Sequence, residues 1–258
     1  MIGVSMSEQF LFNALLIGLF FFAAVTAAVL FFIPAPYGRH LRAGWGPTFE
    51  NRLGWVIMEA PAVVVFAVCF VVGEYRNTWT AWILFILWQS HYVHRSFIYP
   101  LELNSTRKRM PVLIAGLGFL FNMQNGYVNA RYLYTFSGGY PNSWLTDPRF
   151  VAGLLLFLAG YIINRHADST LRRLRQSNPS GYAIPYGGLY RWISCPNYFG
   201  EIIEWLGWAL ATWSLPGLAF AVWTAANLAP RAKSHHTWYR RQFAGYPPQR
   251  KALLPGLW

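Results

Sequence analysis

Long apolar segments constrain the fold of this chain more than any other feature. Seven of them, separated by polar and basic stretches, cover residues 10–33, 53–72, 79–99, 112–130, 150–163, 199–213 and 217–228. The first five are long enough, or nearly so, for a helix of about 20 residues that crosses a bilayer. Backbone groups find no water in lipid, so such segments fold as helices. The sequence predicts an all-α integral membrane protein with seven transmembrane helices.

The rest of the composition agrees with a membrane protein. Charged residues make up 12% of the chain, about half the share of a soluble domain. The net charge of +12 would suggest nucleic acid in a soluble protein, but here the basic residues lie between apolar segments, so no nucleic acid partner is expected. Only Glu8 precedes the first segment, which argues against a cleaved signal peptide. We expect one membrane domain over residues 1–258, with a helical hairpin at Leu215–Pro216–Gly217.

Positive charge falls in alternate loops of this arrangement. With the N-terminus outside, eighteen of the twenty-one Lys and Arg residues lie on the inner side, and only Arg76, Arg131 and Arg149 lie outside. Cytoplasmic loops are enriched in Lys and Arg. The charge pattern therefore predicts an outer N-terminus and a cytoplasmic C-terminus.

Glu59 stands out because it lies in the middle of the uncharged segment 53–72. An ionised carboxylate at that depth costs about 2.5–3.5 kcal/mol or more, and such residues usually face a functional interior. Pro61 follows two residues later and favours a local bend. The alternative is an acid that is neutral or paired with a neighbouring helix for packing alone. Glu59 is the first candidate for a site residue.

Polar residues at helical spacing mark the inner ends of four segments. The four stripes are Tyr92, Arg95 and Tyr99; Asn164, Asp168, Arg172 and Arg175; Asn197, Glu201 and Glu204; and Arg231, His235 and Tyr239. One such stripe is usually a solvated helix end. Four on one side of the membrane can wall a polar cavity for a phosphate-bearing nucleotide, because Arg binds phosphate and Tyr stacks on rings. Neither a Rossmann motif nor a P-loop is present.

Five sequence stretches are similar to one family of membrane enzymes. They are MEAPA (58–62), QSHYVHRSFIYP (89–100), NRHADSTLRRLR (164–175), YAIPYGGLYRWISCPNYFGEIIEWLGWALATW (182–213) and RKALLPGLW (250–258). In this order and spacing they resemble the steroid 5α-reductases, also called 3-oxo-5α-steroid 4-dehydrogenases. The resemblance implies a seven-helix reductase that takes NADPH from the cytosol and delivers hydride to a 3-oxo-Δ4-steroid. A bacterial-type homologue, monomeric in the lipids of the inner membrane, is expected.

The resemblance also implies roles for particular residues. Glu59 and Tyr92 match the pair that holds the 3-oxo group of the substrate. The family pattern usually has Gln before that Glu, whereas Met58 stands here and removes a donor and an acceptor from the substrate end. The cofactor-binding positions carry over onto Tyr37, Arg95, Tyr99, Arg107, Asn164, Asp168, Arg175, Tyr182, Asn197, Glu201, Arg231, His235 and Tyr239.

Enone reduction explains why these residue types are wanted. Hydride adds to the β carbon and negative charge develops on the carbonyl oxygen, where preorganised donors contribute a few kcal/mol each. Tyr92 can donate to that oxygen. Glu59, if kept protonated by an apolar surround, can donate a second hydrogen bond or orient Tyr92. A membrane-embedded pocket also excludes water and admits a lipophilic substrate.

Other interpretations remain open from the sequence. A membrane methyltransferase that binds S-adenosylmethionine and a lipid or isoprenoid would use the PNYFGE region but give Glu59 no role. A lipid carrier would leave the four stripes unexplained. Tyr92 could belong to an interfacial aromatic belt, and Asp168 with Arg172 could form a surface salt bridge. His91 and His94 have no third ligand nearby, so no metal site is expected.

Overall fold

Seven long helices build most of this protein, for which a computed structural model describes residues 5–258 apart from 37, 41, 104–108 and 179–180. They are α1 (Met6–Phe32), α2 (Asn51–Val72), α3 (Trp79–Val93), α5 (Val112–Arg131), α6 (Pro148–Ser177), α7 (Pro196–Thr212) and α8 (Leu215–Gln242). Each contains most or all of one predicted apolar segment. Three of them, α1, α2 and α6, are long and apolar enough to cross a membrane. The mostly helical membrane fold is confirmed; seven crossings and their direction stay predictions.

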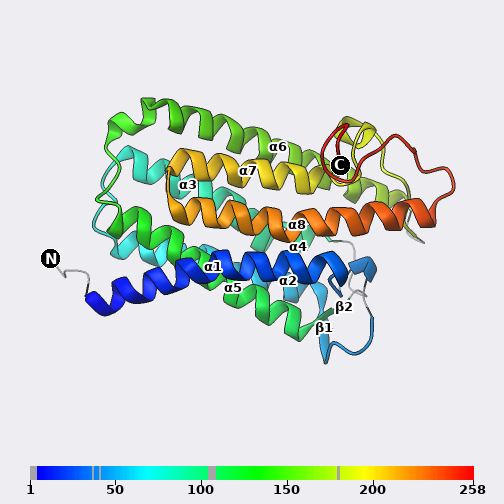
Figure 1. Ribbon diagram of the computed structural model, residues 1–258, viewed down its shortest axis with the longest axis horizontal. Coiled ribbons are helices and arrows are strands. Elements are labelled where there is room, and N and C mark those ends of the chain that lie inside the picture. Colours follow the sequence, from blue (N-terminus) through cyan, green and yellow to red (C-terminus); the bar gives the residue numbers. More distant parts are fainter. Residues whose placement is uncertain (1–4, 37, 41, 104–108, 179–180) are drawn as a thin grey trace.

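The helices lie side by side along the long axis of the molecule (Figure 1). The closest pairs are α6 with α7, α2 with α5, α1 with α8 and α7 with α8. The start of α1 lies at one end of the bundle, and the C-terminal segment lies at the other (Figure 1). Rings of Phe66, Trp88, Trp205 and Trp208 fill the core between α2, α3 and α7.

Side-chain caps fix where several helices begin. Ser5, Thr78, Asp147 and Ser214 each accept a hydrogen bond from a backbone N–H in the first turn of α1, α3, α6 and α8. Such caps satisfy donors that have no partner within the helix. The cap at Ser214 places the hairpin between α7 and α8 at Trp213 and Ser214. The predicted turn at Leu215–Pro216–Gly217 is therefore wrong by two residues: Pro216 lies in the first turn of α8, where it costs no hydrogen bond.

Glycines let α6 and α7 approach at backbone distance. A Cβ added at Gly160 would overlap the backbone nitrogen of Glu204, and one at Gly200 would overlap that of Asn164. Gly153 and Gly207 meet the partner helix in the same way, one heptad away. Small residues at helix interfaces in membranes permit this close packing. The contact places the polar residues of both helices directly opposite each other.

Several features differ from the predicted elements. Helices α6 and α8 run on to Ser177 and Gln242, well beyond the apolar segments that end at 163 and 228. Helix α3 continues through a π-helical turn, His94–Ile98, into the short helix α4 (Tyr99–Glu102). A second π-helical turn, Tyr132–Phe136, follows α5. Two short antiparallel strands, β1 (Thr48–Glu50) and β2 (Arg109–Pro111), were not expected.

Candidate functional site

Glu59 faces the interior of the bundle, where α5 and α3 meet α2. Its side chain is buried, and Asn122 of α5 donates a hydrogen bond from Nδ2 to its Oε2 over 3.1 Å. The Nε of Arg95 lies 3.8 Å from the other carboxyl oxygen. The surround of Glu59 is not wholly apolar, because the π-helical turn after α3 brings a guanidinium to the same place. Met58 points elsewhere and packs against Gly118.

Tyr92 lies next to Glu59 on the same side of α5. It is 3% exposed, and Asn125 Nδ2 lies within hydrogen-bond distance of its hydroxyl, at 3.4 Å. Asn122 and Asn125 are three residues apart on α5, so they share a helix face. Glu59 and Tyr92 are thus brought together by one stripe of asparagines. An interfacial belt position for Tyr92 is wrong, since its ring packs against the buried rings of Trp88 and Trp205.

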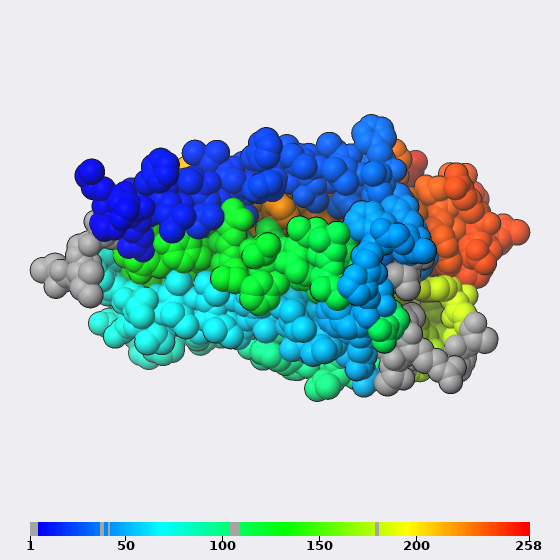
Figure 2. Space-filling model, turned by 90° about the horizontal axis from the view of Figure 1, so that it is seen from below, coloured from blue at the N-terminus to red at the C-terminus, as the bar shows by residue number. Residues whose placement is uncertain are grey.

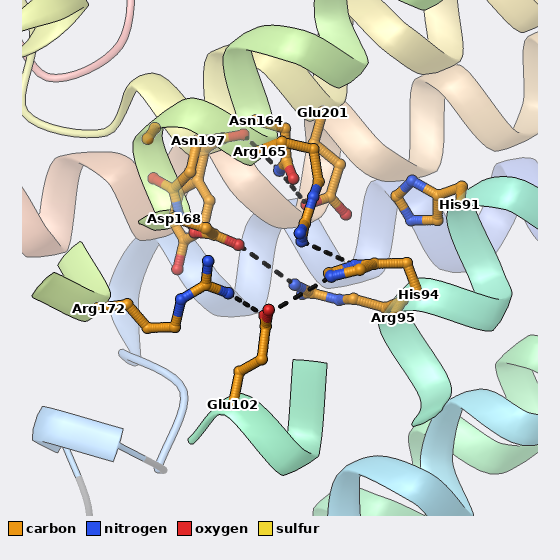
Figure 3. Close-up of polar contacts among 12 residues, drawn as sticks. His91, His94, Arg95, Glu102, Asn164, Arg165, Asp168, Arg172, Asn197 and Glu201 are labelled. Atoms are coloured by element: carbon orange, nitrogen blue, oxygen red, sulfur yellow. Dashed lines mark hydrogen bonds and ion pairs between the residues drawn. The ribbon is translucent and has the colours of Figure 1, made fainter. Parts of the chain in front are cut away.

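Arg95 connects this pair to the polar residues of α6. Its Nη1 lies 3.9 Å from Asp168 Oδ2 (Figure 3). Its guanidinium carbon lies 4.5 Å and 5.0 Å from the ring centres of Trp55 and Tyr99. The π-helical turn that begins at His94 places the side chain there. The predicted proximity of Arg95 and Tyr99 is confirmed.

Four residues of α6 and α7 form a central polar cluster: Asn164, Asp168, Asn197 and Glu201. Asn164 donates to the backbone oxygen of Asn197 over 3.0 Å and to Glu201 Oε2 over 3.3 Å. Asn197 in turn donates to Asp168 Oδ1 over 3.1 Å. Figure 3 shows these side chains converging from the two helices toward Arg95. The close glycine contact between α6 and α7 makes this convergence possible.

The surface salt bridge between Asp168 and Arg172 is not formed. Asp168 is buried and bonds Asn197, while Arg172 pairs with Glu102 of α4 (Figure 3). Glu102 also lies 3.6 Å from His94, which contacts Arg165 over 2.9 Å. These contacts tie the end of α3 to α6.

A second group, the cation–aromatic cluster, surrounds the far end of α8. Tyr198 accepts a hydrogen bond from Arg231 over 3.1 Å and shares one with His235 over 3.0 Å. His235 lies 3.2 Å from His40 and stacks on it. The cluster is completed by a cation with three rings around it: Arg39, Tyr182, Trp238 and Tyr239.

Of the remaining predicted cofactor-binding residues, one is described by the structure and two are not. Arg175, in the last turn of α6, forms no salt bridge among the described residues. Tyr37 and Arg107 lie outside the described residues.

Sequence reasoning missed three features of the site. The asparagine stripe on α5 had a signal, because Asn122, Asn125 and Asn129 recur at helical spacing inside an apolar segment. The buried pair of His91 Nδ1 and Glu204 Oε1, at 2.7 Å, joins residues on different helices. Arg39 gave no signal either, because its ring contacts come from segments more than 140 residues away.

These groups suit a nucleotide with several phosphates. The central cluster presents amide and carboxylate groups that can bond ribose and amide edges, and the cation–aromatic cluster presents guanidinium groups and rings. Arg39 Nη1 is buried and has no hydrogen-bond partner in the described part of the chain. A buried donor without a partner is costly, so an anionic acceptor fits this position.

The fold and the site define a helical membrane protein with a buried acid and phenol beside two polar clusters. The sequence of this chain is similar over almost its whole length to those of known enzymes. The model of the 3-oxo-5-alpha-steroid 4-dehydrogenase family matches residues 108–258. Steroid 5-alpha-reductase DET2 of Arabidopsis thaliana is 41% identical over 255 residues, which cover 96% of this chain and 97% of that protein. The chain therefore belongs to the 3-oxo-5-alpha-steroid 4-dehydrogenase family and is an oxidoreductase.

Animal relatives agree with this assignment. The 3-oxo-5-alpha-steroid 4-dehydrogenase 1 of Bos taurus is 39% identical over 258 residues, or 98% of this chain and 100% of that protein. Its human counterpart is 41% identical over 223 residues, or 86% of this chain and 85% of that protein. The resemblance inferred from the sequence is confirmed. These relatives do not favour a membrane methyltransferase.

Proposed function

We propose that this protein uses NADPH to reduce the Δ4 double bond of 3-oxo-Δ4-steroids, giving 5α-reduced 3-oxosteroids. The names of its relatives support this reaction class. One observation carries the proposal: Glu59 and Tyr92 lie buried on one asparagine-lined face, with Arg95 leading from them to the central polar cluster. A substrate oxygen and a cofactor can thus meet at this face.

Glu59 and Tyr92 act at the substrate oxygen. The Tyr92 hydroxyl and protonated Glu59 donate hydrogen bonds to the 3-oxo group, on which negative charge develops. NADPH, when bound, supplies the hydride that adds to the β carbon, and a proton from water or from a side chain then adds to the α carbon to complete the reduction. Asn122 and Asn125 hold the two donors in place before substrate binds. Preorganised donors of this kind lose no reorganisation energy during the reaction.

The cofactor is held by the central polar cluster and the cation–aromatic cluster. The proposed contacts are Tyr37, Arg95, Tyr99, Arg107, Asn164, Asp168, Arg175, Tyr182, Asn197, Glu201, Arg231, His235 and Tyr239. Guanidinium groups bind the phosphates, and the amides and carboxylates bond ribose and carboxamide groups.

The substrate reaches the site from the lipid. Figure 2 shows a hollow between α1 (blue) and α5 (green), with α8 (orange) visible at its floor. A lipophilic steroid needs no aqueous route to such an opening. In the proposed arrangement one domain of seven helices, a monomer in the inner membrane, has its N-terminus outside and its cofactor side in the cytoplasm. The positions of the chain ends at opposite ends of the bundle support an odd number of crossings (Figure 1).

The catalytic assignment is tested with Glu59→Gln and Tyr92→Phe. Tyr92→Phe removes a donor to the developing oxyanion, and Glu59→Gln replaces the O–H of the acid with a less acidic amide N–H. We therefore expect turnover to fall by at least about tenfold in each variant while NADPH affinity is kept. Turnover is measured as loss of NADPH absorbance with an enone steroid, and affinity by titrating cofactor fluorescence. Tyr134→Phe is the control, because Tyr134 is another buried tyrosine whose hydroxyl bonds only a backbone oxygen. Turnover close to the parent rate in both site variants would contradict the assignment.

A further inference from the structure

Arg39 has an unusual environment for a cation. Its guanidinium carbon lies 4.9 Å, 4.6 Å and 4.8 Å from the ring centres of Tyr182, Trp238 and Tyr239. Contacts of this kind attract a cation through the ring faces but leave its charge uncompensated. The three rings fix the position of Arg39 without neutralising it.

Two arginines beside the central polar cluster are already paired with acids. Arg95 lies near Glu59 and Asp168, and Arg172 pairs with Glu102. Arg39 forms no salt bridge with any described carboxylate, and its buried Nη1 has no hydrogen-bond partner among the described residues. One buried guanidinium nitrogen, Nη1, therefore remains available to donate to an anion, the kind of group that guanidinium binds strongly.

The charged side chains that act on His40, the neighbour of Arg39 in the chain, are arginines. Burial, followed by the charges of Arg39, Arg231 and Arg42, lowers the pKa of His40. His40 is therefore neutral near pH 7 and can accept or donate a hydrogen bond without adding charge. The nearest cationic groups point to a ligand that carries a localised negative charge at this place.

A series of side-chain contacts connects Arg39 with Glu59 and Tyr92. Glu59 leads to Arg95 at 3.8 Å, and Arg95 leads to Asp168 at 3.9 Å. Asp168 bonds Asn197 at 3.1 Å, next to Tyr198 in the chain. From Tyr198 the contacts continue through His235 and His40 to the neighbouring Arg39. In the proposed function, a dinucleotide with its reactive ring at Glu59 and Tyr92 would extend along these contacts, with its adenosine end toward Arg39.

We propose that Arg39 binds the 2′-phosphate on the adenosine ribose, and so makes the enzyme select NADPH over NADH. This inference rests on the proposed function. NADPH and NADH differ only in that phosphate, which lies on the adenosine half, so a cation there discriminates between them. An arginine in this role is the usual solution in dinucleotide enzymes of other folds. Trp238 and the two tyrosines hold the guanidinium and present ring faces beside the adenine.

The test compares Arg39→Met with Arg39→Lys. Dissociation constants for NADPH and NADH are measured on the full-length protein by cofactor fluorescence, without substrate. A charged hydrogen bond is worth about 1.5–3 kcal/mol, so Arg39→Met should weaken NADPH binding by about ten- to hundredfold. The dissociation constant for NADH should change by less than about threefold, because truncating a side chain that contacts no group of NADH has little effect on affinity. Arg39→Lys keeps the positive charge but loses the planar guanidinium, so its affinity for NADPH should fall between those of the parent protein and Arg39→Met.

Arg42→Met is the matched control, because Arg42 lies in the same loop but is exposed and contacts Trp45 and the Pro34 oxygen. It should leave the preference for NADPH unchanged. Displacement of NADPH by 2′,5′-ADP and 5′-AMP gives a second readout: wild-type protein should favour 2′,5′-ADP, and Arg39→Met should not.

Three results would overturn the inference. One is an equal loss of NADPH and NADH affinity in Arg39→Lys, since that variant preserves the charge and the ring contacts. Another is an unchanged preference in Arg39→Met. The third is a wild-type protein that binds both dinucleotides equally well, which would leave the proposed reaction intact. A wild-type protein that binds neither dinucleotide would instead refute the proposed function, and this inference with it.

Discussion

Asparagine side chains set how Glu59 and Tyr92 lie relative to each other. Asn122 donates to Glu59 and also to the backbone oxygen of Met58, over 2.8 Å. Asn125 approaches the Tyr92 hydroxyl and is itself fixed by Asn129. A buried amide is costly unless its hydrogen bonds are made, so these contacts restrict where the asparagines can lie. The acid and the phenol depend on α5 for their geometry, although α5 supplies neither.

We therefore expect Asn122→Ala to lower kcat by about tenfold, because a misplaced donor loses most of its effect in the transition state. NADPH affinity should stay near the parent value, since Asn122 lies away from the central polar cluster. Turnover with an enone steroid and titration of cofactor fluorescence measure the two quantities. Gln124→Ala is the control: Gln124 is another amide on α5, but it bonds Leu15 of α1. An equal loss of kcat in that control would mean that Asn122 only supports the packing of α5.

Glycine spacing decides how α6 and α7 pack, and with it the position of four polar residues. Gly160 lies directly against the backbone of Glu204, and Gly200 against that of Asn164. A side chain at either position would push the helices apart and separate Asn164 from Glu201 and Asn197. Hydropathy could not reveal this pairing, because it reports how apolar a segment is and not which face meets which helix.

Gly160→Ala should lower the free energy of unfolding by about 1–3 kcal/mol, the usual cost of overpacking. Gly116→Ala, on α5, should be neutral or stabilise by about 0.5–1 kcal/mol, because that glycine is exposed with open space around its Cα and Ala favours a helix. Thermal unfolding in detergent, followed by tryptophan fluorescence, compares the two. A destabilisation of the same size in both variants would show that backbone conformation, not close packing, is what the glycines provide.

Residues of the site could be predicted where they form a pattern along the sequence, and could not where they come together only in the folded chain. Glu59 was visible because one acid in an apolar segment is conspicuous, and the stripes on α6, α7 and α8 were visible as helical spacing. Hydropathy alone stops at residues 163 and 228, short of the ends of α6 and α8, because polar residues that face a buried site resemble a solvated surface. Arg39 was missed because it meets Tyr182 and Trp238 only after the chain folds. Local patterns predict helices and their faces, while long-range contacts decide which residues share a site.

At the scale of the whole molecule, the direction of the chain in the membrane is still a prediction. The protein's own thiols cannot report it. Cys69 and Cys195 are both buried, and burial raises the pKa of Cys195 to about 12, so its thiolate is scarce at neutral pH. Since the thiolate is the reactive form, the parent protein should resist a membrane-impermeant maleimide from either side. Because its own thiols should not be labelled, the parent protein is a suitable background for introduced cysteines.

Ser143→Cys and Ala244→Cys place exposed thiols on the loop before α6 and on the segment after α8. With an outer N-terminus and seven crossings, Ser143→Cys should be labelled in intact cells, and Ala244→Cys only in inside-out vesicles, because the charge pattern puts the basic C-terminal segment in the cytoplasm. The labelled fraction is read by a mass shift on gels, against the parent protein as background. Labelling of both thiols from one side would contradict the model, because a chain with seven crossings exposes these two loops to opposite compartments. Labelling with the sides exchanged would keep seven crossings and reverse the direction, which would move the nucleotide clusters away from cytoplasmic NADPH.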